Sequence, residues 1–229
     1  MAKIAESFHG NLIIDFDSTF IQIEALDKLA EISLTNLPQR AEILSQVEHI
    51  TRLGMEGQIS FRQSLQQRLQ LFTSNKSAVL QLISILQNSI STSILPYQGW
   101  FQTHASQIYI ISGGFQDYIL PVIQEFQIPS SQVLANQFIF DSNNQIIGFE
   151  PENPLSQPGG KVLAVQKLQL TNPVHIVGDG YSDYQIKESL PHFKFIAYTE
   201  NISRDTVIAK ADFQAHNWSK VLDYLHNSI

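Results

Sequence analysis

The stretch Leu12-Ile13-Ile14-Asp15-Phe16-Asp17-Ser18-Thr19 decides the fold that we expect for this chain. Its apolar first half is short and rich in β-branched residues, which favours a buried parallel strand over a helix. Asp15 and Asp17 follow at the carboxyl end of that strand, where alternation makes their side chains point the same way. Ligands bind at this end of the strands in open α/β sheets. Because two adjacent carboxylates repel each other, the pair indicates a divalent cation or a shared proton.

Three further apolar runs are predicted to be strands of the same sheet: Ile108–Ser112, Val174–Val177 and Phe193–Tyr198. Each is followed by a polar or glycine-containing turn and then by a stretch with a helical pattern. This alternation predicts an α/β fold with a Rossmann-like, doubly wound parallel sheet. A small β-hairpin is expected from Asn136–Phe140 and Ile146–Glu150, around a turn at Ser142–Gln145.

The alternation is interrupted between about Ile21 and Ser93, where the sequence reads as consecutive helices. Helices are expected from Gln22 to about Ser33, from Pro38 to about Arg52, after Ser60 as N-cap, and along the stripe Val79, Leu82, Ile83, Leu86 and Ile90. We therefore predict a helical cap, residues 22–93, inserted after the first strand of a core formed by residues 1–21 and 94–229.

Two more strands are expected to end in polar, glycine-containing turns. In Ser112-Gly113-Gly114, a hydroxyl and accessible backbone N–H groups could bind an anion, although a turn that needs glycine would show the same pattern. Gly178-Asp179-Gly180-Tyr181-Ser182-Asp183 adds two carboxylates, or else forms a simple turn with a helix N-cap.

Three charged residues stand in unusual places or admit two interpretations. Lys161 opens a predicted helix, where the helix dipole disfavours a cation unless an anion lies beside it. Arg68 lies at the edge of the apolar stripe of the third helix, so its guanidinium needs a carboxylate or phosphate partner or reaches solvent. Glu24 could form an ordinary surface pair with Lys28.

The composition limits the class of protein. Hydrophobic residues make up 43% of the 229 residues, which is too many for a disordered chain. The net charge of −7 argues against a nucleic-acid or anionic-membrane partner, and the absence of cysteine excludes thiolate chemistry. No signal-peptide pattern or membrane-length apolar run is evident, so we expect a cytoplasmic protein.

Taken in order, the Asp-x-Asp, Ser-Gly-Gly, Lys and Gly-Asp-Gly-x-x-Asp motifs resemble those of the haloacid dehalogenase (HAD) superfamily of aspartate-nucleophile phosphatases. The closer resemblance is to the phosphoserine phosphatase family, from about Leu12 into the C-terminal third. It rests on these segments: Asp15–Thr19 with Glu24, Ala25–Ala30, Met55–Gly57, Phe61, Arg68, Ile111–Phe115, Leu134–Asn136, Gly148–Phe149 and Gly159–Lys161.

This resemblance implies Mg²⁺-dependent hydrolysis of O-phospho-L-serine, the last step of serine biosynthesis, by a monomer or homodimer. It implies that Asp15 is the nucleophile that becomes an aspartyl-phosphate and that Asp17 is the general acid and base. The other implied roles are phosphate binding by Ser112, Gly113 and Lys161; Mg²⁺ binding by Asp15, Asp17 and Asp179, with support from Asp183; and substrate binding by Glu24, Met55, Phe61, Arg68, Gly114 and Ser182.

Three positions depart from the family pattern. Phe20 replaces a smaller aliphatic residue, Ser182 replaces Asn or Thr, and Gln137 replaces a basic residue. The alternatives are a related enzyme on the same scaffold that acts on phosphothreonine or on an amino-sugar or amino-alcohol phosphate, or that transfers a phosphoryl group to homoserine, and a non-catalytic sensor of phosphometabolites. The sequence does not distinguish L- from D-phosphoserine.

Overall fold

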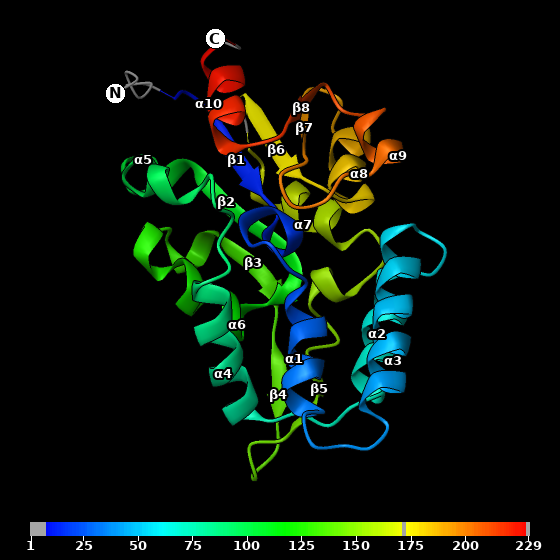
Figure 1. Cartoon of the computed structure of the whole chain (residues 1–229). Coiled ribbons are helices and arrows are strands. Elements are labelled where there is room, and N and C mark those ends of the chain that lie inside the picture. Colours follow the sequence, from blue (N-terminus) through cyan, green and yellow to red (C-terminus); the bar gives the residue numbers. More distant parts are fainter. Residues whose placement is uncertain (1–7, 171–172, 228–229) are drawn as a thin grey trace.

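A six-stranded, fully parallel sheet forms the centre of the molecule in the computed structural model, which describes residues 8–170 and 173–227 (Figure 1). The strand order is β3-β2-β1-β6-β7-β8. The strands are β1 (Asn11–Ile14), β2 (Ile108–Phe115), β3 (Val133–Asn136), β6 (Val174–Gly178), β7 (Lys194–Tyr198) and β8 (Phe213–Ala215). The chain adds strands first on one side of β1 and later on the other, so the sheet is doubly wound. The strand order reverses at β1, which is where such sheets bind ligands.

Helices cover both faces of this sheet because the strand side chains alternate. Leu12 and Ile14 belong to the larger hydrophobic core, whereas Ile13 belongs to the smaller one on the other face. The larger core is closed by α5 (Gln98–Thr103), α6 (Gln116–Ile123) and α10 (Trp218–Asn227); the smaller is closed by α7 (Gly160–Leu168) and α8 (Tyr181–Ser189). A short helix, α9 (Asp205–Ile208), follows β7. Among the described residues, no helix has the length and apolar character needed to cross a membrane.

Between β1 and β2 in the chain, α5 is preceded by four consecutive helices, which we call the helical insert. They are α1 (Ala25–Ser33), α2 (Arg40–Met55), α3 (Phe61–Gln70) and α4 (Lys76–Gln87). Figure 1 shows α2 beside α3, with α1 between that pair and α4, and α4 packs against α6. The Ser60 side chain caps α3 by accepting a hydrogen bond from the Gln63 N–H, and the Gln63 side chain accepts one from the Ser60 N–H. This reciprocal pair is a capping box.

An antiparallel hairpin, β4 (Phe138–Phe140) and β5 (Ile146–Phe149), extends from the sheet towards the insert. Its turn is tied to the connection between α3 and α4. The Lys76 amide donates to the Asn144 carbonyl at 2.9 Å, and the Ile146 amide donates to the Ser74 carbonyl at 2.8 Å.

The structure confirms the doubly wound α/β fold, the four predicted strands, the four helices and the hairpin, with some corrections. Asn136 ends β3 instead of starting the hairpin. The first helix begins at Ala25, not at Gln22, because a turn of five residues, Phe16–Phe20, follows β1. That turn brings Asp17 Oδ1 within 2.7 Å of the Ala25 amide, so the Asp17 carboxylate accepts a bond from the first turn of α1.

Candidate active site

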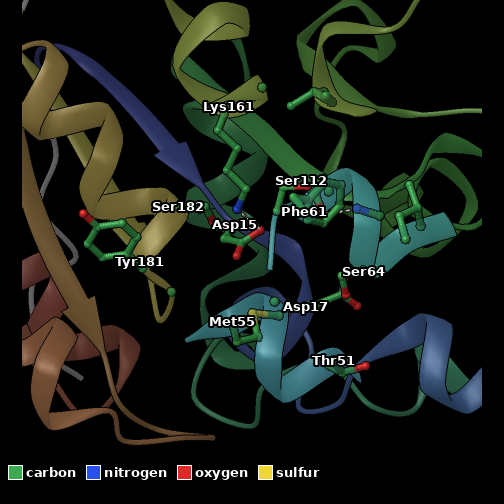
Figure 2. A pocket seen from close by; sticks show the side chains of 18 of the residues that line it. Asp15, Asp17, Thr51, Met55, Phe61, Ser64, Ser112, Lys161, Tyr181 and Ser182 are labelled. Atoms are coloured by element: carbon green, nitrogen blue, oxygen red, sulfur yellow. Dashed lines mark hydrogen bonds and ion pairs between the residues drawn. The ribbon is translucent and has the colours of Figure 1, made fainter. Parts of the chain in front are cut away.

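A cavity of about 260 Å³ lies between the carboxyl ends of the strands and the helical insert (Figure 2). Its lining includes predicted residues from both sides: Asp15, Asp17, Glu24, Met55, Phe61, Arg68, Ser112, Gly113, Gly114, Lys161 and Ser182. The structure therefore brings together residues that are up to 167 positions apart in the chain, from Asp15 to Ser182. Asp179 and Asp183 do not line the cavity but contact or adjoin residues that do.

A buried lysine holds two of the predicted carboxylates together. Lys161 Nζ lies 2.7 Å from Asp15 Oδ1 and 2.8 Å from Asp183 Oδ1. Figure 2 shows the Lys161 side chain reaching down to Asp15. Burial alone would lower the pKa of Lys161, but the charges of Asp15 and Asp183 outweigh it and raise that pKa. The position of Lys161 at the start of a helix predicted an anion beside it. The structure places two there, the carboxylates of Asp15 and Asp183.

One positive charge shared by two carboxylates leaves an excess of negative charge. Burial, together with the neighbouring charge of Asp15, raises the pKa of Asp183 to about 7, although Lys161 opposes the shift. The Gly180 amide donates to Asp183 Oδ2 at 3.1 Å and fixes the carboxylate below the cavity. Without a further cation, this cluster tends to keep a proton near neutral pH.

Asp179 is held by a partner that the sequence did not reveal. Arg204, in the loop between β7 and α9, forms an ion pair with Asp179 Oδ2 and also donates to its backbone carbonyl at 3.2 Å. Thr19 donates to Asp179 Oδ1 at 2.9 Å. The only signal for such a partner was the need of a buried aspartate for a counter-charge.

Asp15, Asp179 and Asp183 form a group suited to a divalent cation. All three are buried, and one carboxylate oxygen from each lies within 4.8 Å of the others. Hard cations such as Mg²⁺ prefer oxygen ligands of this kind, so the donor set fits. The carboxylate of Asp17 is not a member of this group and turns towards the insert instead.

Asp17 lies at the cavity wall, between the carboxyl ends of the strands and the helical insert. Burial raises the pKa of Asp17 well above its usual value, and the charges of Glu24 and Asp15 add to the effect. Glu24 accepts a hydrogen bond from Ser18 Oγ at 2.6 Å. Its predicted alternative partner, Lys28, pairs with Glu31 instead, so Glu24 remains at the cavity.

Ser112-Gly113-Gly114, predicted as a turn after the strand, forms the last part of β2, and its glycines leave room for neighbouring side chains. The Gly114 amide donates to Ser112 Oγ at 2.9 Å, and the Asn136 side chain donates to the Gly113 carbonyl at 2.8 Å. A Cβ atom on Gly113 would lie 2.4 Å from the Phe61 ring, so only glycine lets α3 pack this closely on β2.

The insert places a second buried cation at the cavity. Arg68 is only 6% exposed, and its Nη1 atom lies 3.3 Å from Asp27 Oδ1 and 3.2 Å from Thr51 Oγ1. Thr51 in turn donates to Asp27 at 2.8 Å. Arg68 therefore has the carboxylate partner that its position demanded, while its side chain still lines the cavity.

The doubly wound sheet with a helical insert after β1, the paired aspartates at the end of that strand and the buried Lys–Asp cluster agree with the arrangement that the resemblance to HAD phosphatases implied. The chain is 32% identical to a phosphoserine phosphohydrolase-like protein from Francisella tularensis, with 94% of this chain and 99% of that chain covered and a TM-score of 0.83. It is 28% identical to the phosphoserine phosphatase of Homo sapiens over 92% of this chain and 91% of the relative.

It is also 28% identical to the phosphoserine phosphatase of Drosophila melanogaster, over 91% of this chain and 75% of the relative. No protein-family model matches the chain. The relatives and the fold agree with the resemblance of the motifs, and the chain belongs to the phosphoserine phosphatase family.

Proposed function

We propose that this protein hydrolyses O-phospho-L-serine to serine and phosphate in two steps through an aspartyl-phosphate on Asp15. The observation that carries the proposal is the pairing of Asp15 with Lys161 at a small cavity that Glu24 and Arg68 also line. An anionic phosphate and a zwitterionic amino acid would each meet complementary charge there.

In the first step, the Asp15 carboxylate attacks phosphorus and the serine oxygen leaves. Asp17 donates a proton to that oxygen, since its raised pKa favours the protonated carboxyl, and then takes a proton from the attacking water in the second step. Ser112 Oγ, the Gly113 N–H and Lys161 Nζ hold the phosphoryl oxygens while charge moves between them.

Mg²⁺ is the cation that we propose for the carboxylate group. Asp15, Asp179 and the backbone carbonyl of Asp17 would hold it, and Asp183 would support the site through Lys161. When bound, the ion offsets the repulsion between Asp15 and the phosphate dianion. EDTA should abolish phosphate release and added Mg²⁺ should restore it, whereas activity that persists in EDTA would contradict the proposed metal.

Glu24 would receive the substrate ammonium and Arg68 its carboxylate, with Met55 and Phe61 as apolar walls and Gly114 and Ser182 as further contacts. The cavity lies below the range of about 300–1,000 Å³ that is common for drug-sized ligands, which favours a free phospho-amino acid over a phosphoprotein. We also propose that residues 22–93 act as a cap over the core, residues 1–21 and 94–229, and exclude water during the first step.

The test is phosphate release across a panel, with and without Mg²⁺: L- and D-phosphoserine, phosphothreonine, an amino-sugar phosphate and a plain sugar phosphate. We expect the highest kcat/KM for L-phosphoserine. A preference for another ester would assign the same chemistry to that substrate, phosphoryl transfer to added homoserine would show a transferase, and no turnover of any ester would favour a sensor. Rescue of a serine-requiring strain that lacks phosphoserine phosphatase would test the proposed place in cytoplasmic serine biosynthesis.

A further inference from the structure

Tyr118, in the first half of α6, is a buried polar residue that the proposed reaction does not use. Its side chain is fully buried at the cavity wall, and its ring packs near those of Phe16, Phe115 and Phe138. Within residues 8–170 and 173–227, its hydroxyl has no hydrogen-bond partner. Buried hydroxyls are nearly always hydrogen-bonded, so an orphaned one at a ligand cavity points to a partner that arrives with the ligand.

The Tyr118 hydroxyl lies close behind Gly114 and beside Asp17. A Cβ atom on Gly114 would be 2.6 Å from Tyr118 Oη and 3.2 Å from Asp17 Oδ2. The glycine therefore leaves the phenol next to the point where the leaving group of the substrate would meet Asp17. Any larger residue at position 114 would separate the two groups or displace the phenol.

The missing partner is a hydrogen-bond acceptor. Because the buried Tyr118 hydroxyl has no hydrogen-bond partner among the described residues, its O–H proton lacks an acceptor. Burial and the charge of Asp17 raise the pKa of Tyr118 well above its usual value, so the proton stays on the oxygen. The substrate ammonium is a donor and cannot fill this need.

The position favours one acceptor of the substrate over the others. Asp17, Arg68 and Glu24 line the same cavity and their charges act on the Tyr118 hydroxyl, and Glu24 and Arg68 are the residues proposed above to bind the amino-acid part of the substrate. The phosphate end has its own donors in Lys161 and Ser112. Nη1 of Arg68 already contacts Asp27 and Thr51. A substrate carboxylate bound by Arg68 could therefore accept a hydrogen bond from a second donor as well.

We propose that Tyr118 is a substrate-binding residue whose hydroxyl donates a hydrogen bond to the carboxylate of the phospho-amino acid, beside Arg68. This inference rests on the proposed function and adds a determinant of specificity to it. The side chain would make the pocket select for a carboxylate on the leaving group, because esters without one leave the buried hydroxyl unpaired.

The test compares Tyr118→Phe with wild type on L-phosphoserine and on phosphoethanolamine, which has the same ester and amine but no carboxylate. The phenylalanine keeps the ring packing, so the variant should fold with a Tm equal to or above that of wild type. We expect KM for phosphoserine to rise about tenfold or more, as for loss of a hydrogen bond to a charged group, with kcat and the phosphoethanolamine kinetics nearly unchanged. Tyr109→Phe, a half-buried tyrosine on β2 outside the cavity, is the matched control.

Each outcome is informative. A phosphoserine KM within twofold of wild type, or an equal change on both esters, would overturn the role of Tyr118. Wild-type turnover of phosphoserine tests the proposed function separately, because that function can hold while Tyr118→Phe behaves like wild type.

Discussion

The strand ends and the helical insert each form half of the cavity, but they hold their side chains in different ways. At the strand ends, the charged groups are buried and paired with one another, as in the contacts of Lys161 with Asp15 and Asp183. In the insert, Arg68 is buried, whereas Met55 and Phe61 are half-buried apolar side chains that line the cavity. The strand ends therefore form a charged site whose groups hold one another in place. The insert forms a wall of the cavity whose side chains can be changed without disturbing that site.

The backbone explains this difference. Parallel pairing of Ile14 with Val177, and the bond from the Asp15 amide to the Val177 carbonyl at 2.9 Å, place the two acidic strand ends side by side. The insert is joined to the sheet by two adjacent segments, which pair through Ile21 and Ile90. Changes at the strand ends should therefore affect the chemistry with any substrate, and changes in the insert should affect substrate choice.

Asp15→Asn should have the largest effect, because it removes the proposed nucleophile without disturbing the fold. We expect kcat to fall about 10⁴-fold or more on every ester that wild type hydrolyses, with an unchanged far-UV CD spectrum. Asp223→Asn, at an exposed aspartate in α10, is the control. Wild-type-like turnover by Asp15→Asn would remove the distinction between the two halves of the cavity.

The buried cluster should also show itself in the pH dependence of stability. The pKa of Asp183 is about 7 in the folded protein, above its usual value near 4, so its contribution to stability is full below about pH 4 and is lost as pH rises through 7. The advantage of metal-free wild type over Asp183→Asn should therefore shrink between pH 4 and 8, by up to about 4 kcal/mol.

Urea denaturation of both proteins in EDTA measures this difference. Asp212→Asn is a control of opposite sign, because Lys187 and the Phe195 amide lower the pKa of Asp212 despite its partial burial. The contribution of Asp212 to stability is therefore present above about pH 4 and is lost as the pH falls below that value. A difference between wild type and Asp183→Asn that does not change with pH would show that Lys161 neutralises the cluster.

Arg68→Ala tests the insert half. KM for phosphoserine should rise roughly 10- to 100-fold, since a charged hydrogen bond to the substrate carboxylate is lost, while phosphoethanolamine should be affected much less. Steady-state kinetics on both esters measures this, with Arg62→Ala on the same helix as control. Equal losses on the two esters would mean that Arg68 supports the fold of the insert and does not select the substrate.

The same division explains what could be predicted from sequence. The four central strands are continuous apolar runs, and three of them end in the motifs, so both were evident. The two strands that were not predicted, β3 as a member of the sheet and β8, are its edges and have only four and three residues. Edge strands are commonly short, which leaves little periodic signal.

The contacts that complete the site could not be predicted, because they join residues without a shared local pattern. Arg204 lies in a loop 25 residues from Asp179, and Asp27 meets Arg68 only because α1, α2 and α3 pack together. Tyr118 looks like one more apolar residue of α6 until its hydroxyl is found at the cavity. In each case the signal is a buried group that needs a partner, and only the three-dimensional arrangement shows where the partner lies.

The smallest expected effect tests whether the position of α3 alone adjusts substrate binding. Ser60→Ala removes the N-cap of the helix that carries Phe61 and Arg68 and should cost about 1 kcal/mol of stability. KM for phosphoserine should rise a fewfold without a change in kcat, since the strand ends are untouched. Asn75→Ala removes the N-cap of α4, whose residues do not line the cavity, and should cost a similar amount with no change in KM. If both variants raise KM equally, substrate binding depends on the overall stability of the insert. The position of α3 alone would then not determine KM.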